Sequence, residues 1–232
     1  MRRGGRRATS AIAAMFARGM DEVAVTATVA DNLALKASAM PDLLCGESSG
    51  LPPAGFDHGN SPAEFDGLDL AGRRHHRHQQ RHAGAGAGSR GSGRVHRRLL
   101  NRTAACAAAL AEAGVLGAGI TFVCSGTDHG QSFSLEDTAV CGALVETVVR
   151  GAAHGLDDLT SVTLTDSAMA AYRLWRSYPS PRLAFGEASH GRSLASIGLA
   201  HDLDFCAEVD RYAVAPRLHR TDNGQLVLRA GA

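Results

Sequence analysis

The chain has 232 residues, 44% of them hydrophobic, which is enough for a sizeable buried core. A formal net charge of +1 gives the whole molecule no general electrostatic attraction to nucleic acid or to an acidic membrane surface. No stretch approaches the roughly 20 apolar residues of a membrane span, and the basic N-terminal segment lacks a clear signal-peptide cleavage site. The five cysteines are widely spaced and odd in number, which favours reduced, buried thiols and a cytoplasmic protein.

The N-terminal third alternates helix and strand patterns. Apolar residues at helical spacing predict a helix that starts near Ser10 and stops at Gly19. A β-branched strand is expected at 22–28, a helix at 30–40 and a short strand at 41–47. Gly, Pro, Asn and Ser then predict a long loop, 48–62.

The second half repeats this alternation from residue 101. An Ala-rich helix (101–114), the strand GITFVCSG (119–126) and a long helix (135–151) are expected. Residues 166–176 and 189–212 also have helical patterns, and the C-terminal segment predicts a hairpin with Asn223 and Gly224 at its turn. Strands alternating with helices indicate one α/β domain over residues 1–232, with a mainly parallel sheet flanked by helices.

The tract 73–98 breaks this pattern. It contains eight arginines and five of the eleven histidines, and almost nothing that could enter a core. We expect it to be irregular and unable to supply a central strand. GAGSRG, at 86–91, matches a dinucleotide-binding pattern, but no strand pattern precedes it. The histidines could bind a soft divalent metal and the arginines nucleic-acid phosphates, whereas the structural alternative is a solvated loop.

Two loops combine flexible backbone with polar side chains. GFDHGNSP, at 55–62, offers Asn60 and Ser61 as an oxyanion site would require, although it could equally be a turn-rich connection. The predicted strand at 119–126 would deliver Ser125, Gly126 and Thr127 to its carboxyl end, where parallel sheets place ligands. Backbone N–H groups and hydroxyls there could hold a phosphate.

Acidic residues near these loops allow two interpretations. Ser134 could cap the following helix, with Glu136 and Asp137 favouring the helix dipole. Alternatively, these carboxylates bind magnesium, an ion that prefers oxygen ligands and lies naturally beside a phosphate. Glu47, at the end of the strand 41–47, could supply a further ligand.

Four segments in the same order and spacing resemble the 2-phosphosulfolactate phosphatase family. They are GFDHGNSP, VCSGTDHGQSFSLEDTAVCGALV (123–145), the segment 190–218, and ATSAIAAMFARGMDEV after Arg7. Arg7, Ala8 and Thr9 match the end of that family's Asp-Val-Leu-Arg-Ala-Thr start motif. The resemblance implies an α/β fold and magnesium-dependent hydrolysis of 2-phosphosulfolactate, or a related small phosphate monoester, to sulfolactate and phosphate. In methanogens this step lies on the route to coenzyme M.

The resemblance also suggests roles for individual residues. Arg7 would be a catalytic anion clamp, with Asp137 and Glu136 as catalytic residues that bind Mg²⁺ together with Glu47. The substrate would be bound by Asn60, Ser61, Ser125, Gly126 and Thr127. His190 and Arg192 match a family segment too, but a surface role fits them equally well. The expected partner is a small phosphate ester rather than nucleic acid or membrane, and a homo-oligomer is left open.

The chain departs from the family over residues 73–98, where relatives carry a strand and a Thr-rich Asn-Gly-Thr loop. Read one base later, codons for residues 73–87 permit Val-Val-Ile-Thr-Ala-Thr-Asn-Asn-Gly-Thr-Arg-Ala-Leu-Ala. We therefore hypothesise that a compensated frameshift or a sequencing error spans the tract, which would impair activity if the printed chain is real. The alternative function is a non-catalytic remnant whose Arg/His tract binds nucleic acid or a transition metal.

Overall fold

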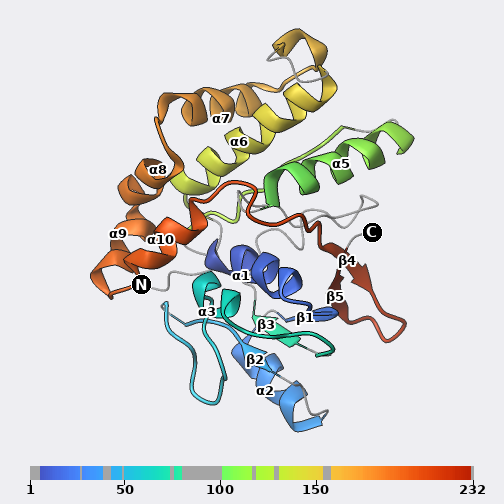
Figure 1. Ribbon diagram of the computed structural model, residues 1–232, viewed down its shortest axis with the longest axis vertical. Coiled ribbons are helices and arrows are strands. Elements are labelled where there is room, and N and C mark those ends of the chain that lie inside the picture. Colours follow the sequence, from blue (N-terminus) through green and yellow to red (C-terminus); the bar gives the residue numbers. More distant parts are fainter. Residues whose placement is uncertain are drawn as a thin grey trace.

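The computed structural model describes residues 6–26, 28–38, 43–48, 50–73, 76–79, 101–116, 119–127, 131–153 and 158–230 (Figure 1). Helices are α1 (Arg6–Ala17), α2 (Val29–Ser38), α3 (Pro62–Asp66), α5 (Arg102–Leu116), α6 (Leu135–Ala152), the 3-10 helix η3 (Leu159–Ser161), α7 (Asp166–Ser177), α8 (Pro181–Glu187), α9 (Ser189–Ser196) and α10 (Ala200–Cys206). Strands are β1 (Glu22–Thr26), β2 (Leu44–Cys45), β3 (His76–Gln79), β4 (Arg217–Arg220) and β5 (Leu226–Arg229).

The described strands form one sheet with the order β2-β3-β1-β5-β4. The first three strands pair in parallel, whereas β1 with β5 and β5 with β4 pair antiparallel. The chain therefore combines helices and strands, which is compatible with the α/β class, but the described sheet is mixed rather than mainly parallel. The difference arises because the predicted C-terminal hairpin, which is confirmed, joins the sheet through β5, and hairpin strands are antiparallel by construction.

Strand β3 overturns one expectation about the Arg/His tract. The backbone of His76–Gln79 lies between β1 and β2, with Val23 opposite His76 and Leu44 opposite Arg77. The tract therefore does supply a central strand, because two parallel neighbours present N–H and C=O groups that any backbone can pair. Beyond Gln79 the tract, including the GAGSRG motif, falls outside the described residues.

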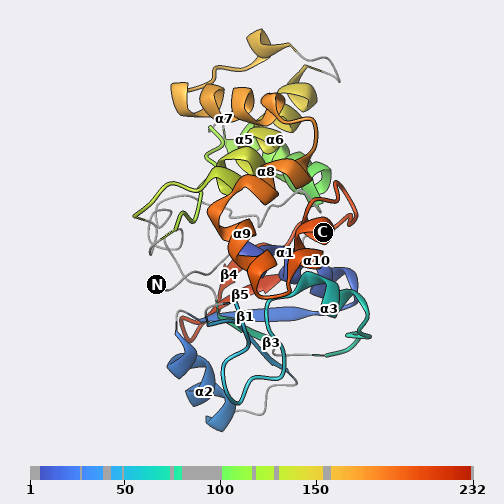
Figure 2. The same cartoon turned by 90° about the vertical axis from the view of Figure 1, so that its left-hand side faces the viewer.

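Helices cover both faces of the sheet. Figure 2 shows α1 and α3 on one face and α2 on the other. The predicted first helix is confirmed, and its apolar stripe packs on inward-facing residues of β1 and β5. The centre of this core contains Ile12, Met15, Phe16, Val23 and Leu228.

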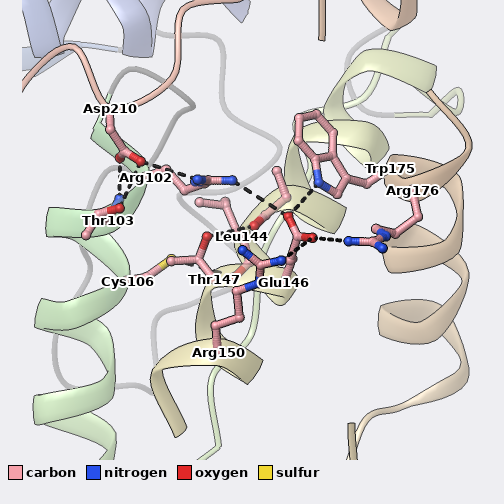
Figure 3. Close-up of polar contacts among 11 residues, drawn as sticks. Arg102, Thr103, Cys106, Leu144, Glu146, Thr147, Arg150, Trp175, Arg176 and Asp210 are labelled. Carbon is pink, nitrogen blue, oxygen red and sulfur yellow. Dashed lines mark hydrogen bonds and ion pairs between the residues drawn. The ribbon is translucent and has the colours of Figure 1, made fainter. Parts of the chain in front are cut away.

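Helices α5, α6 and α7 form a separate layer at the other end of the molecule (Figure 1). The buried carboxylate of Glu146, on α6, joins all three helices (Figure 3). It accepts hydrogen bonds from Trp175 Nε1 at 2.9 Å and Arg176 Nη1 at 2.8 Å, and its Oε2 lies 3.8 Å from Arg102 Nη1. A charged group tolerates such burial only when it is paired and hydrogen-bonded. These contacts of Glu146 therefore fix the positions of α5, α6 and α7 relative to one another.

Two other expected elements differ. The segment 119–126 is not a strand: it has neither helical nor strand conformation, and within the described chain it does not join the sheet. The helical pattern at 189–212 forms α9 and α10, separated at Gly198, which has φ of 82°, a conformation that glycine adopts readily. No helix of the described ranges is long and apolar enough to cross a membrane.

Candidate active site

Arg7 lies at the centre of a buried polar cluster at the N-terminal end of α1. Its side chain is 3% exposed. Nη1 donates to Asp202 Oδ2 at 2.5 Å, and Nη2 donates to Glu47 Oε2 at 3.0 Å and to the carbonyl of Gly50 at 2.6 Å. The guanidinium therefore links α1, the loop after β2 and α10, three segments far apart in sequence.

Asp202 connects this cluster to the Asn60–Ser61 loop. The second carboxylate oxygen of Asp202 accepts a hydrogen bond from Ser61 Oγ at 2.6 Å. Asp202 is fully buried, and Arg7 and Ser61 compensate its charge, with His201 Nε2 also 3.5 Å from Oδ1. Sequence reasoning missed this residue. The sequence held one weak indication that Asp202 is buried, because at helical spacing it shares a face with the apolar residues Leu199 and Cys206.

A cavity of about 30 Å³ opens beside Arg7 and Asp202. Glu136, from the first turn of α6, and His190, from α9, line it as well. A space of this size is enough for a bound ion or for one or two water molecules. His190, which could have been a surface residue, is thus a buried part of the site, whereas Arg192 is exposed and donates to the carbonyl of Glu187.

Several buried polar atoms around the cluster have no hydrogen-bond partner within the described residues. They are Arg7 Nε, Glu47 Oε1 and both side-chain amide atoms of Asn60. Asn60 is 1% exposed and directly precedes Ser61. Buried polar groups are nearly always satisfied, so these atoms call for a ligand, an ion or ordered water.

Asp137 lies next to Glu136 but has a different role. Its backbone N–H donates to Ser134 Oγ at 3.2 Å, which confirms Ser134 as the helix cap. The Asp137 carboxylate accepts a hydrogen bond from the backbone N–H of Gly126 at 3.0 Å. It therefore holds the predicted phosphate-binding segment against the N-terminal end of α6. Thr127 closes a tight loop by exchanging backbone hydrogen bonds with Ser132.

The structure thus divides the predicted site residues into two adjoining groups. In the first group Arg7 and Glu136 line the cavity, and Glu47 and Ser61 are hydrogen-bonded into the polar cluster. Asn60 is the buried neighbour of Ser61 in the chain. The other is the capped start of α6 with its bound segment and consists of Ser125, Gly126, Thr127 and Asp137. Glu136 and Asp137 are consecutive residues, so the two groups meet at the first turn of α6.

The donors present are those that magnesium prefers. Glu47 and Glu136 supply carboxylates beside the cluster, and Asn60 and Ser61 supply neutral oxygens. Three carboxyl groups (Glu47, Glu136 and Asp202) accompany the single guanidinium of Arg7 here, an arrangement that a divalent cation would help to balance. In the described part of the chain no three His, Cys, Asp or Glu side chains converge on one metal position. Magnesium often keeps several waters and needs only one or two carboxylates, so the donor set fits it.

Comparison with known sequences shows the family of the chain. The sequence profile of the 2-phosphosulpholactate phosphatase family matches residues 6–221. Proteins named probable 2-phosphosulfolactate phosphatase are similar to this chain over most of their length. The one from Carboxydothermus hydrogenoformans is 29% identical, covering 97% of this chain and 87% of its own. That from Deinococcus radiodurans is 31% identical (91% and 84%), and that from Thermosynechococcus vestitus is 33% identical (90% and 84%). The matched range includes Arg7, Asn60, Glu136 and His190. Because the profile matches nearly the whole chain, the chain belongs to the 2-phosphosulpholactate phosphatase family.

Proposed function

We propose that this protein hydrolyses 2-phosphosulfolactate, or a related small phosphate monoester, to sulfolactate and inorganic phosphate with the help of Mg²⁺. Family membership supports the class of reaction. The observation that carries the proposal is the buried cluster around Arg7, where carboxylates outnumber cations and the Asn60 amide has no partner among the described residues. Such an arrangement is costly in a protein that binds nothing there.

Magnesium, when bound, would polarise the phosphoryl oxygens of the substrate and offset the charge that develops during transfer. Glu47 and Glu136 are the residues that would hold it. The described fold gives the other groups definite tasks. The Nε–H of Arg7 makes no hydrogen bond within the described residues, and the guanidinium is held in a fixed orientation. It could therefore donate a hydrogen bond to a phosphate oxygen. Asp202 and Glu47 fix the orientation of that guanidinium.

The segment 125–127 would bind the phosphate through the Ser125 backbone N–H and the hydroxyls of Ser125 and Thr127, because the N–H groups of Gly126 and Thr127 are donated to Asp137 and Ser132. Asp137 positions this segment, since its carboxylate holds the Gly126 N–H at 3.0 Å. The N-terminal end of α6 adds the favourable potential that helix dipoles offer to anions.

The decisive experiment measures phosphate release from 2-phosphosulfolactate by the purified chain, with and without Mg²⁺. We expect magnesium-dependent release that Glu136→Gln lowers by roughly a hundredfold or more, because a ligand and a buried charge are lost together. Glu208→Gln makes the same change at an exposed position and should leave the rate unaltered. Release that does not need magnesium, or a Glu136→Gln rate equal to that of the wild type, would contradict the proposal.

We infer further that this chain is a slow member of its family, because the central strand β3 is built from His-Arg-His-Gln. Parallel sheets covered on both faces are normally built from apolar, β-branched residues. A folded protein that releases no phosphate would favour the non-catalytic alternative. Binding of nucleic acid or a transition metal that is lost on deleting residues 73–98 would then establish it.

A further inference from the structure

Two cysteines lie against each other beside the segment 125–127. Their sulfurs, Cys124 Sγ and Cys141 Sγ, are 3.3 Å apart. Cys124 is exposed and Cys141 is partly exposed, so a small oxidant can reach them, and the expectation of buried thiols is wrong for Cys124. Cys45 and Cys106 are buried instead, and burial raises the pKa of the Cys45 thiol well above its usual value, which keeps it protonated and unreactive.

The cysteine pair lies where it can act on the proposed phosphate-binding segment. Cys124 immediately precedes Ser125 in the chain. Cys141 follows Asp137 by four residues on α6, so both side chains point from the same face of that helix. The Asp137 carboxylate already holds Gly126, and the sulfur pair provides a second contact between the same segment and the same helix face.

We propose that Cys124 and Cys141 are a redox modification site, at which a reversible disulfide fixes the 125–127 segment to α6. A disulfide needs a sulfur separation of about 2.05 Å, so the two sulfurs must approach by roughly 1.2 Å. Cys124 lies in the segment 119–126, which belongs to no helix or strand and can shift without breaking one. Cys141 can remain in place on α6.

The oxidant is a low-molecular-weight disulfide such as oxidised glutathione. The thiolate of Cys124 attacks one sulfur of the oxidant, forming a mixed disulfide and releasing one small thiolate. The thiolate of Cys141 then attacks Cys124 Sγ, forming the protein disulfide and releasing the second small thiolate. Two electrons pass from the cysteine sulfurs to the oxidant, and the two protons lost by the cysteines convert the released thiolates to thiols.

Such a disulfide would slow turnover. The shift of Cys124 towards α6 would displace the adjacent Ser125, and the covalent link would keep the segment from adjusting to the substrate. This consequence rests on the proposed phosphatase function. Formation of the disulfide does not rest on that function, because it is inferred from the positions of the two sulfurs.

The test equilibrates the full-length protein in glutathione buffers of increasing oxidation and follows three properties. Peptide mass spectrometry should find a Cys124–Cys141 cross-link with the loss of two hydrogen atoms, reversed by a dithiol. Hydrogen exchange of the amides at 119–127 should slow by roughly tenfold in the oxidised form. Phosphate release should fall by roughly fivefold and recover on reduction.

Cys124→Ser should abolish all three changes, while Cys106→Ser, at a buried thiol outside the pair, should abolish none. The proposal would be overturned if Cys124 and Cys141 both remained free thiols in fully oxidising buffer. Cross-links that form only between other cysteines would overturn it as well. A cross-link that protects the segment while phosphate release is absent in both states would uphold the modification site and refute the proposed function instead.

Discussion

Replacing Asp202 by asparagine tests whether the buried pair with Arg7 supports the fold. The substitution keeps the size of the side chain but removes its charge. Asp202 is fully buried and accepts hydrogen bonds at 2.5 Å from Arg7 and at 2.6 Å from Ser61, so two charge-assisted contacts are weakened together. Arg7 keeps Glu47 and the Gly50 carbonyl, which limits the damage.

The expected magnitude follows from these contacts. Breaking a buried ion pair costs about 3–5 kcal/mol because one charge is left without compensation. The asparagine amide in the Asp202→Asn variant can still accept one hydrogen bond and Glu47 remains beside Arg7, so we expect the lower end, about 3 kcal/mol. For a chain of this length each kcal/mol lowers Tm by about 2–4 °C, which gives a decrease of about 6–12 °C.

Thermal and urea unfolding of the purified variants measure this difference. Asp204→Asn is the matched control: it lies on the same helix, but Asp204 is 66% exposed and pairs with surface Arg182, so a change within about 0.5 kcal/mol is expected. Equal Tm values for Asp202→Asn and the wild type would refute the reasoning. A raised Tm would mean that excess negative charge in the cluster outweighs the pair with Arg7.

Three further predictions concern packing, pH and the Arg/His tract. Gly142→Ala should destabilise the α6–α7 contact by about 1–3 kcal/mol in urea unfolding, because its Cβ would lie 2.0 Å from the Ala171 carbonyl. Gly114→Ala, in open space on α5, should instead be neutral or stabilising; equal losses would contradict this. Burial raises the pKa of Asp66, but hydrogen bonds from a tyrosine and two arginines outweigh it and lower the pKa below its ordinary 3.8. The free energy of unfolding should therefore fall as the pH drops below about 3.8, and less so in Asp66→Asn, as acid titration monitored by circular dichroism would show. Replacing residues 73–87 by the one-base-shifted reading should stabilise the protein by about 2 kcal/mol or more and raise its phosphatase rate, and a lower urea midpoint would count against the frameshift hypothesis.

The sequence by itself determined the elements whose signals are local. The helix that contains Ile12 and Phe16, the long helix capped by Ser134 and the hairpin turn at Asn223 and Gly224 all depend on contacts between residues close in the chain. It also determined family membership, because the matched motifs keep their order and spacing. Most of the proposed ligand-binding residues could therefore be predicted from the sequence.

Only the tertiary structure decided which of those residues meet. It brought Asp202 to Arg7 across 195 positions of sequence and turned His190 into the same cavity, neither of which a local pattern could indicate. It also made a central strand of His76–Gln79, since the pairing of β1 and β2 with that backbone outweighed side chains that disfavour a strand. Local propensity depends on neighbours in sequence, whereas pairing, burial and charge compensation depend on neighbours in space.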